Sequence, residues 1–132
     1  MDCLFCEIAK GNIPSNKVYE DDEVIGFLDI NPTSLGHALF IPKNHADNAL
    51  DSRQQAAVFE AACKYATKAM EKLGAEGINL ISNVNEAAGQ TVFHFHVHVI
   101  PRYSNSAKDQ LEYHHGTIEK TDLADLANLL SE

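Results

Sequence analysis

Residues 92–101 read Val-Phe-His-Phe-His-Val-His-Val-Ile-Pro, so three histidines alternate with apolar residues along one short segment. Successive side chains of a β-strand point to opposite faces of a sheet. We therefore expect His94, His96 and His98 to share one face of a strand whose other face belongs to the core. Each imidazole carries a donor and an acceptor, so three in a row are costly for packing alone. The pattern indicates chemistry: metal ligation, nucleophilic attack or contact with an anion.

Three roles for this histidine row remain open at this point. Two histidines one residue apart on a strand can reach one zinc ion, but the outer pair would lie roughly 13–14 Å apart, too far for a shared ion. A neutral histidine is also a good nucleophile toward phosphorus, and His96 has a neighbour on each side to orient it or pass a proton. The third alternative is an exposed, histidine-rich face without chemistry.

The residues just before the row favour phosphate chemistry. Gly89 lets the backbone approach a ligand closely, and the amide of Gln90 and the hydroxyl of Thr91 are neutral donors suited to phosphate oxygens. The sequence has neither a glycine-rich P-loop nor a dinucleotide-binding fingerprint, so we expect a phosphate to be held in another way.

The composition is that of an ordinary globular domain. The chain has 132 residues, 45% of them hydrophobic and 22% charged, which is enough for one domain with its own core. A formal net charge of −9 argues against a nucleic-acid polymer as partner but does not exclude a single bound nucleotide. We find no membrane span and no signal peptide, and we expect a cytoplasmic location. Three cysteines, an odd number, do not suggest a disulfide framework.

Hydrophobic periodicity and turn residues predict an α+β fold. We expect a mostly antiparallel sheet of about five strands, with one long helix packed on it. The strands are expected at 17–20, 23–30, 37–41, 78–84 and along the histidine row. The long helix should open with a capping box at Ser52 and stop at Gly74. Short helices are expected at 4–10 and 122–130, the second with Thr121 as N-cap and packed on the domain or on a partner.

Several blocks of the chain, in order, resemble the histidine-triad (HIT) family. Residues 88–102 match its signature of three histidines separated by apolar residues, residues 3–8 are similar to its N-terminal opening, and residues 27–32 and 36–45 resemble its second block. The resemblance extends over roughly residues 1–103. It implies a single HIT domain over residues 1–132 with a variable tail at 103–132, and a homodimer in which long helices and an edge strand pair.

The resemblance implies hydrolysis at the α-phosphate of a purine nucleoside phosphoramidate or similar adenylate conjugate, releasing AMP or GMP. His96 would be the nucleophile that forms a nucleotidyl-histidine intermediate, and His98 would contact the phosphate and the leaving group. The residues implied at the substrate are Asp29 at the ribose, Ile30 at the base, the supporting His37, and Asn83, Gly89, Gln90 and Thr91. The alternatives are diadenosine polyphosphate hydrolysis, a non-catalytic nucleotide-binding module, and a zinc hydrolase that uses the triad as ligands.

Cys3 and Cys6 form a Cys-x-x-Cys pair, which by itself fits metal binding, redox chemistry or accident. Some bacterial members of the family that this chain resembles bind zinc through two such cysteines, a later histidine and the first histidine of the triad. Those positions here are Cys3, Cys6, His45 and His94, a complete Cys2His2 set of the kind found in structural zinc sites. The resemblance thus implies structural zinc and no cofactor for the chemistry.

Overall fold

Five strands form one sheet in the order β1-β2-β3-β5-β4, and all neighbouring strands are antiparallel. The computed structural model describes residues 3–112, 116 and 120–131. The strands are β1 (Lys17–Glu20), β2 (Val24–Leu28), β3 (Ala38–Pro42), β4 (Gly77–Ile81) and β5 (Val97–Arg102). A long helix, α2 (Gln55–Leu73), connects β3 to the edge strand β4, and β5 then inserts between them. The predicted α+β class and strand number are confirmed.

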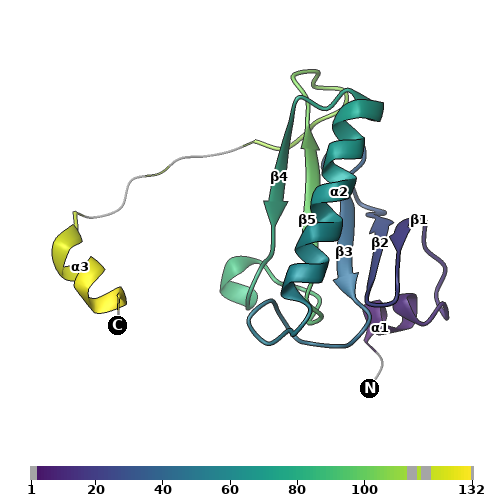
Figure 1. Cartoon of the computed structure of the whole chain (residues 1–132). Coiled ribbons are helices and arrows are strands. Elements are labelled where there is room, and N and C mark those ends of the chain that lie inside the picture. The colour runs from purple at the N-terminus through teal and green to yellow at the C-terminus, as the bar shows by residue number, and fades with distance from the viewer. Residues whose placement is uncertain (1–2, 113–115, 117–119, 132) are drawn as a thin grey trace.

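The sheet has two differently covered faces. Along one face lies α2 (Figure 1), whose alanines allow a close approach to Phe40, Val97 and Val99 of the sheet. The other face carries the short helix α1 (Leu4–Ala9), whose Phe5 and Ile8 pack against apolar residues of β2 and β3. Because α1 covers only part of its face, the rest of that face stays open for a ligand.

The histidine row joins the sheet later than its sequence pattern predicts. β5 begins at Val97, so His94 and His96 precede the strand and the expectation of a strand over the whole row is wrong. The reason is Pro42 at the end of β3, which has no N–H for the ladder. The Phe95 N–H instead donates to the Ala46 carbonyl at 2.7 Å. The predicted alternation nevertheless holds, since Phe95, Val97 and Val99 belong to the core under α2.

The helices α2 and α3 do not begin as the sequence predicted. α2 begins at Gln55, and Ser52 accepts only the Gln54 N–H, so there is no capping box. Gly74 ends α2 as predicted, with a φ of 72° that favours glycine. The N-cap of α3 (Leu123–Leu130) is Asp122, not Thr121.

Of the two expected arrangements for α3, packing on the domain is not seen, because every α3 residue is exposed. Four leucines of this helix therefore face solvent: Leu123, Leu126, Leu129 and Leu130. Packing on a partner stays a prediction. Within the described residues, no helix has the length and apolar character needed to cross a membrane.

We expect Gly26→Ala to lower the free energy of unfolding by about 1–3 kcal/mol, because over-packing a filled core forces its neighbours to move. A Cβ at Gly26 in β2 would overlap the ring of Phe40, which is fully buried on the neighbouring strand. Urea unfolding measures the change. The matched control is Gly77→Ala on the edge strand, where the new Cβ meets nothing closer than 3.8 Å, and a change within about 0.5 kcal/mol is expected. Equal effects at both glycines would contradict this account of the core.

Candidate active site and metal centre

A cavity of about 540 Å³ opens on the sheet face that carries α1. This volume is in the range of small-molecule binding pockets. Most of its wall is apolar, with Leu4, Phe5, Ile8, Ile13, Phe27 and Leu39 contributing side chains. Its polar lining residues include Asp29, Asn83, Thr91, His96 and His98. A largely apolar wall with these polar groups suits a ligand that has both an apolar and a charged part.

Most of the predicted substrate residues border this cavity. Ile30 and Gly89 lie on it together with the polar residues just named. The side chain of Ile30 is 85% exposed, which excludes a role in the core and leaves its apolar surface for a ligand to cover. His37 is buried behind His98 rather than on the cavity wall.

Gln90 has contacts that differ from its predicted role as a phosphate donor. Its side chain is buried, and its Nε2 donates to the carbonyls of Asp47 and Val92 at 2.6 and 3.1 Å. Its Oε1 accepts the Asn85 N–H at 2.8 Å. Both amide hydrogens and the oxygen are thus used by the backbone, and Gln90 shapes the loop before the triad instead of offering a donor to the cavity.

The hydrogen bonds of His96 leave one ring nitrogen available. Its Nδ1 lies 2.7 Å from the His94 carbonyl, which can only accept, so Nδ1 carries the proton. Nε2 therefore keeps a free lone pair on a residue that lines the cavity. Burial lowers the pKa of His96 below its usual 6.5, which keeps the ring neutral at pH 7. A neutral imidazole with a free nitrogen is the nucleophilic form of histidine.

His98 has the opposite tautomer, set by a chain of hydrogen bonds behind it. The Thr33 N–H donates to His37 Nδ1 at 3.2 Å, so the proton of His37 is on Nε2. That Nε2 donates to His98 Nδ1 at 3.0 Å, which leaves the proton of His98 on its own Nε2. Asp29 Oδ2 lies 3.5 Å from His37 Nε2 and adds a carboxylate to the chain. The cavity thus has a lone pair on His96 next to an N–H on His98.

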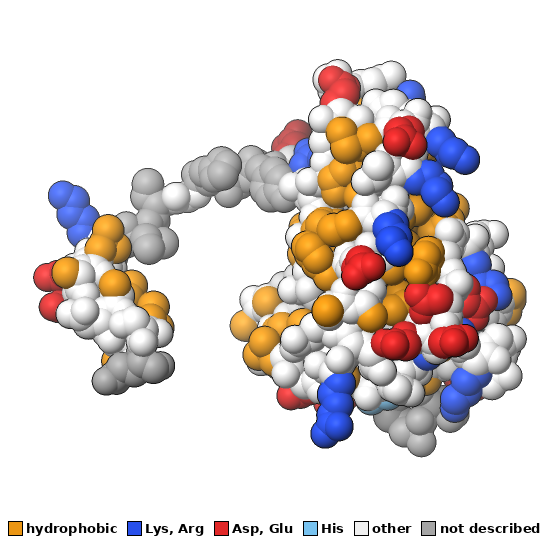
Figure 2. All heavy atoms as spheres, viewed as in Figure 1, with side chains coloured by type: hydrophobic (Ala, Val, Ile, Leu, Met, Phe, Trp, Pro, Cys, Tyr) orange, Lys and Arg blue, Asp and Glu red, His pale blue; other side chains and the backbone are white. Residues whose placement is uncertain are grey.

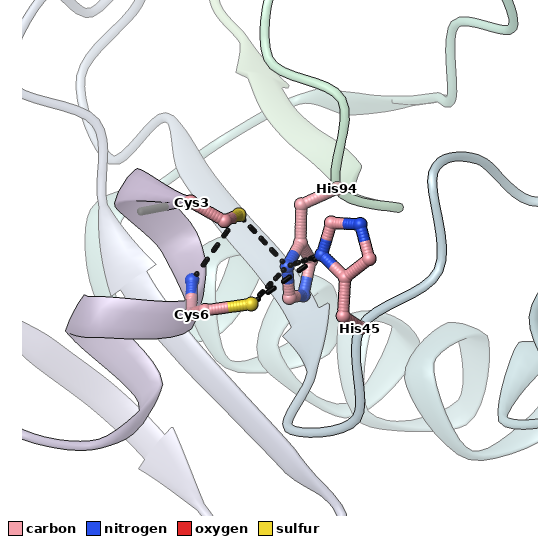
Figure 3. Close-up of side chains that lie close together, drawn as sticks. All are labelled: Cys3, Cys6, His45 and His94. Atoms are coloured by element: carbon pink, nitrogen blue, oxygen red, sulfur yellow. Dashed lines mark hydrogen bonds between the residues drawn. The ribbon is translucent and has the colours of Figure 1, made fainter. Parts of the chain in front are cut away.

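Four side chains from three segments meet beside the cavity (Figure 3). Cys3 and Cys6 come from the start of α1, His45 from the loop after β3, and His94 from the segment before β5. The distances to His94 Nδ1 are 3.4 Å from each sulfur and 3.2 Å from His45 Nδ1. Cys6 Sγ lies 3.3 Å from His45 Nδ1.

The donor atoms of this cluster fit a tetrahedral zinc ion. Zn–S bonds of about 2.3 Å and Zn–N bonds of about 2.0–2.1 Å would place sulfur and nitrogen about 3.6 Å apart and two nitrogens about 3.3 Å apart. His94 Nε2 donates to the Pro42 carbonyl at 2.8 Å, and His45 Nε2 to Asp47 at 2.9 Å, so both Nδ1 atoms hold lone pairs. Two facing lone pairs repel unless a cation lies between them.

Deprotonation of both sulfurs of the cluster would need a cation nearby. Burial and the neighbouring Cys3 sulfur raise the pKa of the Cys6 thiol to about 11, so two thiolates are unfavourable there by themselves. A divalent ion would remove this cost, because a coordinating thiol is deprotonated.

The second cluster, Asp29, His37 and His98, has ligand-type atoms within reach of one another but a different chemistry. A metal on His37 Nε2 would push its proton to Nδ1, where the Thr33 N–H already points. This cluster therefore works as the hydrogen-bond chain that orients His98.

Sequence reasoning missed the contribution of α1 to the cavity and the structural role of Arg102. Phe5 and Ile8 recur at helical spacing, which indicates a buried stripe, but nothing local shows that this stripe faces the triad. Arg102, the last residue of β5, bonds Asp109 at 2.7 Å and Asn79 at 2.7 Å.

We expect His98 to stay neutral down to about pH 5, because burial, with the adjacent His96 and His37 rings, lowers its pKa from 6.5 to about 4. Between these two pKa values the unfolded chain binds the proton and the folded protein does not, so the free energy of unfolding falls as pH is lowered from 6.5 to 4. NMR titration of the imidazole and urea unfolding at each pH measure both effects. The control is His98→Asn, whose free energy of unfolding should depend less on pH than that of the wild type. Titration of His98 near pH 6.5 in the folded protein would contradict the assignment.

Comparisons with known proteins agree with this geometry. A family model described as the HIT domain matches residues 10–105. Protein hit from Bacillus subtilis is 46% identical over 103 residues, covering 76% of this chain and 71% of the relative. Adenosine 5'-monophosphoramidase hnt1 from Schizosaccharomyces pombe is 44% identical over 103 residues, covering 77% of this chain and 75% of that protein.

A solved structure of a Zn-bound histidine triad family protein from Mycobacterium smegmatis aligns with a TM-score of 0.75 and 40% identity. The alignment covers 83% of this chain and 81% of that one. The family model spans more than half of the chain and includes the complete histidine row. The chain belongs to the HIT family.

Proposed function

We propose that this protein is a nucleotide hydrolase that cleaves purine nucleoside phosphoramidates, or similar adenylate conjugates, at the α-phosphate. The observation that carries the proposal is the pair of opposite tautomers on the cavity wall, a free lone pair on His96 Nε2 beside an N–H on His98 Nε2. A phosphoramidase among the relatives, 44% identical to this chain, supports the same reaction class.

The first step is attack of His96 Nε2 on the α-phosphorus. A bond forms between phosphorus and this nitrogen, and the bond from phosphorus to the leaving nitrogen breaks. The leaving amine takes up one proton, and His98 Nε2–H is placed to carry it, since Nδ1 of that ring is held by His37. The His94 carbonyl, bonded to His96 Nδ1, steadies the ring as it gains positive character.

Water completes the reaction. Its oxygen attacks the nucleotidyl-histidine while one of its two protons returns to His98 Nε2, the bond between phosphorus and His96 breaks, and AMP leaves as the second proton passes to solvent. The net reaction consumes one water and returns both histidines to their starting tautomers. Two moderate barriers replace one high barrier, which is the advantage of covalent catalysis.

The cavity suits a nucleoside monophosphate portion. Its apolar wall can hold a purine face, and Ile30 can cover the base from the rim. Asp29 belongs to the cavity lining, and its carboxylate can accept hydrogen bonds from ribose hydroxyls. Asn83, Gly89 and Thr91 are left for the phosphate.

The charge of the cavity favours phosphoramidates over diadenosine polyphosphates. Among its described lining residues there is no Lys or Arg. A polyphosphate bridge carries several negative charges and is normally bound by cationic side chains or metal ions. A substrate with a single anionic phosphoryl group fits neutral donors and imidazoles better.

We also propose that Cys3, Cys6, His45 and His94 hold a structural zinc ion, supported by the fit of their donor atoms and by the zinc-bound family structure. The ion would link α1 to two loops and take no part in the reaction.

The location that we propose for the protein is the cytoplasm.

A homodimer is the proposed assembly. The outer edge of β4 has no partner strand among the described residues. Figure 2 shows apolar side chains at the surface along α2, and Phe59 and Met70 are 51% and 46% exposed on one stripe of that helix. Such a patch and an open strand edge are features of an interface.

We expect His96→Asn to lose AMP release from adenosine 5'-phosphoramidate by about 10³-fold or more, because no other group replaces the nucleophile. Product release is followed by chromatography, with AMP binding and thermal unfolding of the variant as controls for folding. If the wild type is inactive on this substrate but cleaves a diadenosine polyphosphate, the protein is a diadenosine polyphosphate hydrolase instead. Substantial activity in the folded variant would overturn the nucleophile and favour metal-activated water.

Phe59→Asp should convert the dimer to a monomer, because a carboxylate on the apolar stripe would be buried without a partner. Light scattering should give twice the chain mass for the wild type and the single mass for the variant. Thr67→Asp, at an exposed position of the same helix, is the control and should stay dimeric. A monomeric wild type would contradict the assembly.

A further inference from the structure

One short helix belongs to both sites. α1 contributes Leu4, Phe5 and Ile8 to the cavity wall, and its first turn contributes Cys6, with Cys3 as N-cap, to the metal centre. Any displacement of α1 would therefore alter both sites together. The two sites also share the histidine row, because His94 belongs to the metal centre and His96 to the cavity.

Phe5 is the side chain that joins α1 to the nucleophile. Its side chain is 5% exposed, and its ring meets the His96 ring edge to face, with centroids 5.1 Å apart and planes at 88°. The centroid of the Phe5 ring also lies 5.6 Å from that of Phe27 and 6.0 Å from that of His94. An aromatic contact of this kind orients the imidazole as well as burying it.

α1 has little stability of its own. It has six residues, far fewer than a helix needs to persist in isolation. Its anchors are the burial of Phe5 and Ile8 and the contacts of the two cysteines with His45 and His94. The cysteine contacts join α1 to the loop after β3 and to the segment before β5.

A second connection runs through the backbone of His94. Its ring lies in the metal centre and is held on the far side by the Pro42 carbonyl. Its own carbonyl accepts the proton of His96 Nδ1 at 2.7 Å, the bond that sets the nucleophilic tautomer. Fixing His94 therefore fixes the acceptor that orients His96.

We propose that a zinc ion bound by Cys3, Cys6, His45 and His94 controls nucleotide affinity at the cavity, with Phe5 as the positioning residue that couples the two sites. The inference rests on the nucleotide site proposed above and adds its regulation. With the ion bound, α1 closes the apolar wall and Phe5 holds the His96 ring. When the ion is removed, α1 loses its link to the two loops, and the wall that receives the base loosens.

Coupling between two sites is reciprocal, so zinc must raise the affinity for nucleotide by the factor by which nucleotide raises the affinity for zinc. We expect this factor to be about 5–150, the usual range for coupled sites. The test is calorimetric binding of AMP to full-length protein loaded with zinc and to the same protein stripped by a chelator. Competition with a chromophoric chelator then gives zinc affinity with and without AMP.

Phe5→Leu separates coupling from simple loss of structure. This variant should keep its zinc affinity, because Phe5 is not a ligand, but AMP should bind the zinc-loaded form more weakly and the coupling factor should fall toward 1. The matched control is Phe59→Leu on α2, which should leave both affinities and their coupling unchanged. Circular dichroism reports whether the stripped protein stays folded.

Each outcome decides between the inference and the function on which it rests. Equal AMP affinity with and without zinc would overturn the coupling and leave the nucleotide site standing. No AMP binding by the zinc-loaded protein would overturn the proposed function itself. Failure to bind zinc would overturn the inference, as would a Phe5→Leu variant with unchanged AMP affinity. Unfolding of the stripped protein would also overturn the inference, because the ion would then be needed for the whole fold and not for the position of α1.

Discussion

A buried imidazole has to satisfy a donor and an acceptor at the same time, and this requirement organises the whole site. His94 and His96 each use a proton to bond a backbone carbonyl, which leaves His94 Nδ1 for the metal centre and His96 Nε2 for the cavity. His98 instead accepts from His37, and so it alone among the three keeps a proton for a ligand. Three identical side chains thereby have three different hydrogen-bonding states, set by two backbone carbonyls and by the His37 side chain.

The two-faced sheet makes this division possible. Alternate residues of the row go into the core under α2, which anchors the segment, while the histidines go to the face that α1 only partly covers. The end of the β3 ladder at Pro42 releases the first part of the row from the sheet. His94 can then turn to the cysteines, whereas His98, inside β5, stays beside the cavity. A regular strand along the complete row would have kept the three rings in one line.

The described lining residues of the cavity include no Lys or Arg, in a chain with a formal charge of −9. Binding then depends on shape, on neutral donors and on burial, because there is no strong electrostatic attraction for an anionic ligand. The affinity for a ligand would therefore depend more on the apolar wall, which includes α1 and Phe5, than it would in a site with arginine or lysine. The Cys-His cluster and the apolar wall also lie in direct contact with His96, since Phe5 touches both His94 and His96.

The sequence by itself determined the fold class and the two faces of the histidine row, because alternation and helical spacing are local properties of the chain. The set Cys3, Cys6, His45 and His94 came only from the resemblance to the HIT family, and the structure brings these four side chains together. It did not determine the start of β5, the use of Gln90 by the backbone, or the place of Arg102, since each depends on partners distant in sequence. Only the tertiary structure decided which nitrogen of each histidine is free and that Phe5 faces His96. The physical reason is that tautomers and ring contacts are set by neighbours in space, such as the Pro42 carbonyl and the Thr33 N–H, whose positions no local pattern reports.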